Sequence, residues 1–136
     1  MKKPRRLGDE NMDSGTLMFF EQQPDALPLY EAFLEAVCGR YPDTVTKVGK
    51  SQISFSNRHI FACASFLRVK KKKDLPQPYL VITLGMPYPL DSPRVSVKTE
   101  PYPGRWTTHI VIGKKEDIDG ELMGWVEDAY YFAQAK

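Results

Sequence analysis

Apolar residues recur at two different spacings along this chain, and the spacing predicts where helices and strands lie. From Asp25 to Arg40 they follow the i, i+3, i+4, i+7 stripe of an amphipathic helix. Pro28 suits the first turn of such a helix, and Gly39 with Pro42 is typical of its end. The stripe that would face a core consists of Tyr30, Phe33, Leu34, Val37, Cys38 and Tyr41. We therefore expect an N-terminal helix that buries one face.

A second helix is predicted near the C-terminus. Its start is rich in acidic residues, which the positive end of a helix dipole stabilises: Glu116, Asp117, Asp119 and Glu121. The residues that follow place apolar side chains along one face, which consists of Ile118, Leu122, Trp125, Ala129 and Phe132. We expect this face to pack on a sheet.

The chain between the helices alternates apolar and polar residues and is broken by Gly, Pro and Asn, which is typical of strands joined by turns. The predicted strands are residues 44–48, 51–56, 59–69, 79–86, 94–99 and 105–113. Short links favour antiparallel pairing, and the charged, proline-rich stretch 70–78 is expected to lie outside the sheet. The predicted fold class is α+β: a mainly antiparallel sheet of about five to six strands, with one face covered by the N-terminal and C-terminal helices.

Alternation along the strands separates two faces of this sheet. The face expected to lie under the helices is apolar and carries Val45, Ile53, Phe55, Leu80, Ile82, Leu84, Val95, Val97, Trp106, Ile110 and Ile112. The opposite face is polar and basic and carries Lys47, Gln52, Ser54, Thr83, Arg94, Ser96, Lys98, Arg105, Thr107 and His109.

The length of 136 residues suits one domain. We expect residues 1–16 to be a disordered tail of mixed charge and residues 17–136 to form the α+β domain, with Leu17 to Phe20 as a small edge strand or a packed lead-in. No apolar run approaches the roughly 20 residues that span a bilayer, and the basic start is not followed by an apolar signal core. The expected location is the cytoplasm, without membrane association.

The two cysteines and two histidines bound the chemistry that this chain can support. Cys38 and Cys63 lie among apolar residues and form no metal-binding spacing, so we expect two reduced, buried thiols. His59 and His109 cannot complete a zinc site without carboxylates from elsewhere. No phosphate-cradling glycine motif and no nucleophile with a base is recognisable, so we expect no catalytic residues, no metal and no cofactor.

Charge is segregated along the chain although the net charge is only +2. Residues 44–115 hold 13 Lys and Arg against 3 Asp and Glu, whereas both flanking segments are acidic. Within this basic middle, Arg68, Lys70, Lys71, Lys72 and Lys73 place five positive charges in six residues. Such a run attracts phosphate backbones, but it is also typical of a solvated hairpin tip that keeps a sheet edge soluble.

A candidate binding site follows from the polar face. Arg105, Thr107 and His109 fall on one side of one predicted strand, and Arg94 and Lys98 lie on the corresponding side of its likely neighbour. An arginine offers a bidentate donor fork and a histidine can add a proton near neutral pH, so the set suits a phosphate or a carboxylate. A polar outer face is also what an ordinary antiparallel sheet presents to solvent.

The order of short motifs resembles a known family. The motifs are Lys50-Ser-Gln-Ile-Ser-Phe55, Arg58-His-Ile-Phe-Ala62, Asp91-Ser-Pro-Arg94, Gly104-Arg-Trp-Thr-Thr-His109 and Asp117-Ile-Asp-Gly-Glu-Leu122. Over roughly residues 17–133 the chain is similar to a small bacterial family described only as a domain of unknown function, found alone or appended to predicted endonuclease-like proteins. The resemblance implies the α+β arrangement above and no established activity. The positions that match its polar motif residues are Lys50, Arg58, Arg94, Arg105 and His109.

These observations favour a non-enzymatic ligand-binding or interaction module, with the polar face around Arg94, Arg105 and His109 recognising an anionic group. Lys50 and Arg58 join this set through the resemblance. One alternative is a nucleic-acid-associated accessory domain that uses the lysine run, which would bind with strong salt dependence. Another is an enzyme of unrecognised chemistry, which would need a pocket with a strongly perturbed titratable group.

Overall fold

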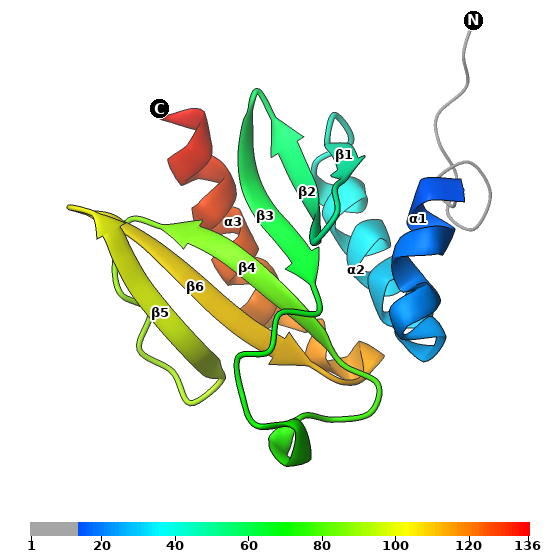
Figure 1. Cartoon of the computed structure of the whole chain (residues 1–136). Coiled ribbons are helices and arrows are strands. Elements are labelled where there is room, and N and C mark those ends of the chain that lie inside the picture. Colours follow the sequence, from blue (N-terminus) through cyan, green and yellow to red (C-terminus); the bar gives the residue numbers. More distant parts are fainter. Residues whose placement is uncertain (1–13) are drawn as a thin grey trace, which may run out of the picture.

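The computed structural model describes residues 14–136 and shows one open sheet with helices at both ends of the chain (Figure 1). The sheet has six strands in the order β1-β2-β3-β4-β6-β5, and every neighbouring pair is antiparallel. The strands are β1 (Val45–Val48), β2 (Gln52–Asn57), β3 (His59–Ser65), β4 (Leu80–Met86), β5 (Val95–Tyr102) and β6 (Arg105–Ile112). The predicted α+β class and antiparallel sheet are confirmed.

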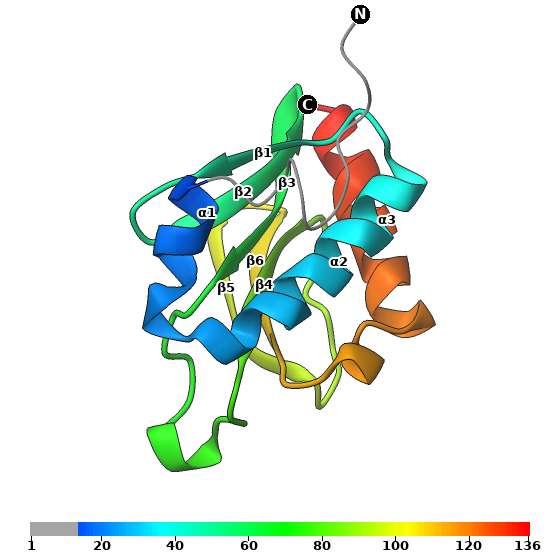
Figure 2. The ribbon, with the colours of Figure 1, turned by 90° about the vertical axis from the view of Figure 1, so that its right-hand side faces the viewer.

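Two long helices, α2 (Leu27–Arg40) and α3 (Gly120–Gln134), lie side by side on one face of the sheet (Figure 2). Their apolar stripes meet the inward side chains of the central strands, because a sheet with an apolar face must bury it against another layer. The strand residues of this core are fully buried: Ile53, Phe55, Leu80, Ile82, Leu84, Ile110 and Ile112. Aromatic contacts tie the layers together, with the ring of Phe55 lying 5.3 Å from that of Phe33 in α2.

The packed face of α3 differs from the expected one by about one residue. Leu122 and Ala129 are buried as expected, and the line continues through Val126 and Ala133. Trp125 and Phe132 are only half-buried at the flank of the helix. Each residue turns the helix by about 100°, so the choice of contact line decides which side chains face the sheet. The small side chains lie against the strands and the large aromatic rings cover the margin.

A β-bulge corrects the predicted faces of β5. Val95 pairs with Ile110, Val97 pairs with His109 and Lys98 pairs with the buried Thr108, so the register shifts between Val95 and Val97. One extra residue reverses the direction of every side chain beyond it. Val97 therefore lies on the polar face and Lys98 on the helix side, the reverse of the prediction. Val45, also expected in the core, is exposed on edge strand β1.

The segment before α2 is helical. Residues 17–20 were expected to form a small edge strand or a packed lead-in, and the strand is wrong: α1 (Ser14–Phe19) and the 3-10 turn η1 (Phe20–Gln22) cover this stretch, followed by the turn η2 (Pro24–Ala26). Ser14 to Thr16 were expected in the tail but form the first turn of α1, and the rest of that predicted tail, residues 1–13, lies outside the described residues. Phe19 and Phe20 are buried, so core packing stabilises a helical turn that their sequence alone does not signal.

The link between β3 and β4 crosses one end of the polar face. It contains the turn η3 (Lys72–Asp74) and places Leu75 and Tyr79 over Val81 and Val111 in a small second apolar cluster. Gly113 allows this close packing, because a Cβ at that position would lie 2.6 Å from Cβ of Pro76. The link is therefore fixed to the sheet at its base, and the basic residues 70–73 are exposed at its tip.

Candidate functional site

The sheet face opposite α2 and α3 contains a hollow of about 430 Å³, here called the polar hollow. It is lined by Gln22, Lys50, Ser51, Gln52, Ser65, Phe66, Leu67, Thr83, Thr107 and His109. These residues come from η1, the turn between β1 and β2, the four strands β2, β3, β4 and β6, and the start of the β3–β4 link. Segments distant in sequence thus converge on one site.

Strand register explains why this face is hollow. Ser54, Cys63, Thr83 and His109 are directly paired across four neighbouring strands and form one row on this face. Residues in such a row share a face because side chains alternate along each strand. Small side chains at three of the four positions leave space above the middle of the sheet. The η1 turn and the β3–β4 link rise at its margins, where Gln22 and Leu67 reach the hollow.

His109 lies at the β6 end of this row and contacts its neighbour Thr83. Its Nδ1 lies 2.8 Å from Oγ1 of Thr83 on the neighbouring strand. Burial lowers the pKa of His109 below its ordinary value of 6.5, so the imidazole is neutral at pH 7. The expectation that His109 carries a proton near neutral pH therefore needs a bound anion to favour the charged form. Burial also raises the pKa of the nearby Cys63 thiol to about 11, which keeps it protonated and unreactive.

Lys50 provides the formal charge of the polar hollow. It lies in the turn between β1 and β2 and lines the same space as His109. None of the described residues that line the hollow carries a carboxylate. The remaining polar groups are hydroxyls and amides, including Ser51, Gln52 and Thr107. One cation among neutral donors, without an acid to neutralise it, is an arrangement that suits an anion.

Two smaller hollows adjoin the polar hollow. One, of about 290 Å³, lies between α1 and the β1–β2 turn and shares Gln22 and Lys50 with it. The other, of about 140 Å³, lies further along β3 and β4 and shares Thr83 and Thr107. The shared residues show that the three hollows are neighbours on the open face.

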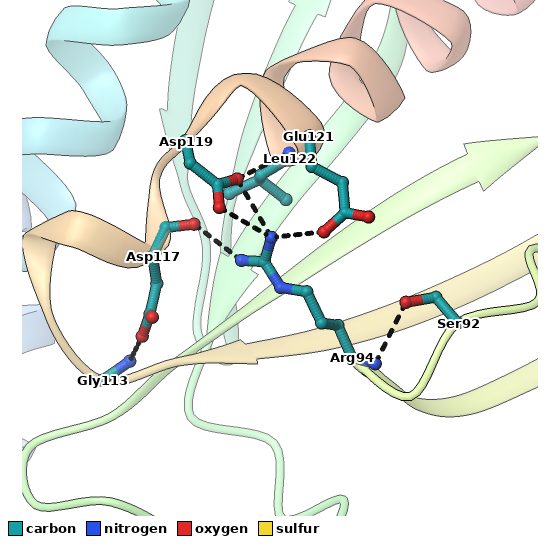
Figure 3. A network of polar contacts seen from close by, with 7 residues as sticks. All are labelled: Ser92, Arg94, Gly113, Asp117, Asp119, Glu121 and Leu122. Carbon is teal, nitrogen blue, oxygen red and sulfur yellow. Dashed lines mark hydrogen bonds and ion pairs between the residues drawn. The ribbon is translucent and has the colours of Figure 1, made fainter.

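Arg94 is the predicted site residue whose contacts lie elsewhere. Its guanidinium donates to the carboxylates of Asp119 and Glu121, each at 3.0 Å, and to the backbone carbonyl of Asp117 at 2.7 Å (Figure 3). It also lies 5.6 Å from the ring centre of Trp125. All of these partners belong to α3 or to the turn before it, so Arg94 joins the start of β5 to the helix layer.

The acidic residues before α3 therefore bind other groups of the protein and stabilise the fold. Asp119 caps the helix, because its side chain accepts from the backbone N–H of Leu122 at 2.9 Å. This bond and the Arg94 guanidinium lower the pKa of the Asp119 carboxyl. Asp117 accepts from the backbone N–H of Gly113 at 2.8 Å and so ties the end of β6 to the same turn. The sequence predicted the start of a helix here, but it did not indicate that Arg94 binds the carboxylates.

The structure brings Lys50 and His109 together at the polar hollow and separates the other predicted site residues. Arg105 pairs with Tyr102 at the far end of the β5–β6 hairpin. Arg94 adjoins Val95, which pairs with Ile110 about 17 Å further along β6. The expected convergence of Arg94, Arg105 and His109 on one patch is thus absent. Whether any of these residues binds a ligand stays a prediction.

Two further predicted groups are exposed in connections. Arg58 occupies the tight turn between β2 and β3. Its φ of 70° is the left-handed conformation that this turn requires. The lysine run, with Arg68 and residues 70–73, projects from the β3–β4 link. Among the described residues, no group of three or more potential metal ligands occurs.

Sequence reasoning missed several residues of the hollow, above all Gln22, Ser65 and Phe66. Gln22 lay outside every predicted element, and Ser65 and Phe66 were assigned to the predicted strand 59–69. The available signal was the run of small polar residues at alternate positions of neighbouring strands, because such residues cannot fill the space above a sheet. The walls themselves arise when distant segments pack around the sheet, and the spacing of apolar residues in the sequence does not predict such packing.

The geometry defines a class of protein: an α+β domain whose open antiparallel sheet is covered by helices on one face and hollowed on the other. Residues 18–133 match the family described as a domain of unknown function, DUF5655, and the chain belongs to this family. No curated protein and no solved structure gives a significant match. Within the part of the chain that the structure describes, no helix has the length and apolar character needed to cross a membrane.

Proposed function

We propose that this protein is a non-enzymatic binding module that holds a small anion in the polar hollow between Lys50 and His109. The observation that carries the proposal is the composition of the hollow, whose described lining contains a lysine and neutral donors but no carboxylate. A ligand carboxylate or phosphate would there meet a positive charge without repulsion from a nearby acid. This retains the sequence-based hypothesis of anion recognition but assigns it to Lys50 and His109 instead of Arg94 and Arg105.

His109 contributes a directional donor to this proposed site. In the tautomer in which Nδ1 accepts the hydroxyl proton of Thr83, Nε2 carries the ring proton and can donate it to the ligand. A bound anion also favours protonation of the imidazole, since an opposite charge stabilises the charged form. Anion affinity should therefore increase as the pH falls from about 8 toward 6.

Binding is favoured over catalysis by the state of the groups around the hollow. The Cys63 thiol is buried and protonated, and His109 is paired with a threonine that has no carboxylate beside it in the lining. We further propose a cytoplasmic location, which the Cys63 thiol supports because reducing compartments preserve thiols.

Isothermal titration calorimetry with inorganic phosphate and with butanoate tests the proposal. A charge-assisted hydrogen bond contributes about 1.5–3 kcal/mol, so Lys50→Gln should weaken anion binding about ten- to a hundredfold. Lys115→Gln, at an exposed position in η4 (Lys115–Asp117) outside the lining, is the matched control and should retain wild-type affinity. Absence of saturable binding by either anion, or equal losses in the two variants, would contradict the proposal.

A second candidate function, association with nucleic acid, is favoured by the position of the lysine run. The link that carries Arg68 and residues 70–73 also supplies Phe66 and Leu67 to the wall of the polar hollow. A phosphate backbone along this tip would thus run beside a second anion site.

This candidate predicts binding of single-stranded oligonucleotides that weakens steeply with salt. Replacing Lys70 to Lys73 with Ser should abolish that binding, whereas affinity for butanoate should remain. If the serine variant binds oligonucleotides as tightly as wild type at low salt, the lysine run is a solubilising tip and this candidate is excluded.

A further inference from the structure

The hollow that continues from Thr83 and Thr107 along β3 and β4 differs in chemistry from the polar hollow. Its volume is about 140 Å³, and its remaining lining consists of Ile60, Phe61, Ala62, Cys63, Leu84 and Gly85. On the open face this lining presents the Ile60 side chain and the bare backbone of Gly85, where the polar hollow has a lysine, amides and hydroxyls. The side chains of Phe61, Ala62 and Leu84 belong to the core under the helices, so these residues contribute only backbone here. We call this smaller hollow the apolar annex.

We propose that the ligand is an amphipathic acid, with its anionic group at Lys50 and His109 and a short apolar substituent in the apolar annex. This inference rests on the proposed function, since it assigns a second part of the same ligand. The shared residues Thr83 and Thr107 make the two spaces direct neighbours, so one molecule that extends past these threonines would reach both.

The dimensions of a sheet set the length of that substituent. Gly85 lies two residues beyond Thr83 on β4, which corresponds to about 7 Å along the strand. His109 is paired with Thr83 on the adjacent strand, about 4.8 Å away. The two offsets combine to a separation of roughly 8 Å between His109 and Gly85. An acid with a chain of a few carbons spans this distance, and acetate does not.

Two features of the annex indicate that it receives an apolar group. Ile60 is 52% exposed on β3, an exposure that a bound alkyl group would reduce. Gly85 leaves the opposite side open, because a Cβ built there has no atom within 4 Å beyond its chain neighbours. A glycine inside a strand weakens it, and close approach of a ligand is one established reason for its presence.

Titration calorimetry with acetate, butanoate, hexanoate and octanoate tests the inference in the full chain. Each buried methylene strengthens binding by up to about fourfold, so hexanoate should bind at least about tenfold more tightly than acetate. The gain should end once the annex is filled, so octanoate should add little. Affinity that is independent of chain length, or that continues to rise without a limit, would overturn the inference.

Gly85→Leu separates the annex from the anion site. The leucine side chain should fill the annex, remove the gain from acetate to hexanoate and leave acetate affinity at the wild-type value. Gly85→Ser adds a small polar side chain and should retain most of the gain. Both substitutions place a better strand former at this position, so folding is not threatened.

The failure of each proposal is recognisable. If Lys50→Gln weakens all the acids equally and Gly85→Leu has no selective effect on hexanoate, the annex inference is wrong and the anion site stands. If Gly85→Leu weakens hexanoate but Lys50→Gln changes nothing, the chain binds an apolar group and the proposed anion site is wrong. If no acid binds, both are wrong.

Discussion

The two faces of this sheet use the same strands for opposite purposes. On β4, Ile82 and Leu84 are fully buried under the helices, whereas Thr83 between them points into the polar hollow. Cationic side chains on the two sides of the sheet also have different surroundings. Arg94 is held by the carboxylates of Asp119 and Glu121, but Lys50 lies in a hollow whose described lining has no acid.

This difference shows how a structural cation is distinguished from a candidate binding cation. Residue type and strand position made Arg94 look like a ligand-binding residue, and its partners assign it to the fold. A cation whose charge is already compensated has little to offer a ligand, whereas an uncompensated one beside a concavity can recognise an anion. Substitutions on the two faces should therefore have different consequences: loss of stability on the helix side and loss of binding on the open side.

The largest effect is expected in the core under the helices. Phe55→Ala should lower the free energy of unfolding by about 3–5 kcal/mol, because it leaves a cavity next to Phe33 and Tyr30. Thr107→Ser, on the open face, should cost less than about 1 kcal/mol. Urea denaturation of both variants measures the contrast. A loss below about 1 kcal/mol for Phe55→Ala would show that the assigned core face is wrong.

A smaller loss of stability is expected when the Arg94 network is removed. Arg94→Ala should cost about 1–2 kcal/mol, the value of charged hydrogen bonds discounted for the exposure of both carboxylates. Asp119→Asn should cost less, because asparagine retains the helix cap to Leu122 and loses only the ion pair.

The same variants test whether the two faces are independent. Butanoate affinity should be unchanged in Arg94→Ala and in Asp119→Asn, measured under conditions where both proteins are folded. A loss of affinity without a loss of stability would place Arg94 in the binding site and show that the two faces of the sheet are not independent.

A still smaller effect is expected from the titration of His109. Its pKa in the folded protein lies below the ordinary value of 6.5, so below that pH the unfolded chain binds a proton that the folded chain does not. Stability should therefore fall as the pH is lowered through about 6.5, until the folded pKa is reached, and should be independent of this group at higher pH.

His109→Gln should remove this part of the acid sensitivity in urea melts between about pH 5 and 7.5. His59→Gln is the matched control, because His59 is exposed in the β2–β3 hairpin. If the two variants have the same pH dependence as wild type, His109 titrates as a solvated group and its burial in the hollow is not supported.

The smallest effect on folding is expected at the tip of the β3–β4 link. Replacing Lys70 to Lys73 with Ser should change the free energy of unfolding by no more than about 0.5 kcal/mol, since all four side chains are exposed. Pro76→Ala provides the contrast at the base of the link, where Pro76 packs against Gly113. Thermal melts compare the two, and a larger loss in the serine variant would show that the tip contributes to the fold.

The strand and helix pattern was readable from the sequence because each element obeys a simple period. The alternation that places Ile110 inward and His109 outward on β6 is preserved from one end of the strand to the other. The period fails on β5, where a bulge reverses Val97 and Lys98, because no residue signals the extra position. It also fails in α1, where burial of Phe19 and Phe20 in the core decides the conformation.

The candidate site was less accessible to sequence reasoning for a related reason. His109 and Lys50 were both named, as were Gln52, Thr83 and Thr107 on the polar face. Gln22, Ser65 and Phe66 were missed, because the hollow depends on which segments rise around the sheet. Arg94 was assigned to the wrong face because it precedes β5, where alternation does not yet apply and the carboxylates of α3 attract the guanidinium. Long-range partners of this kind appear only when the chain is folded.

An NMR titration of the ¹⁵N-labelled protein with butanoate tests most directly whether the polar hollow binds an anion. If the polar hollow binds the anion, saturable shifts should appear at the amides of Lys50, Ser51 and Gln52 and at the imidazole of His109, with Arg94 unaffected. Lys50→Gln should suppress these shifts. Shifts confined to the lysine run, shifts that do not saturate, or an unaltered titration in Lys50→Gln would contradict the assignment of the open face as an anion-binding surface.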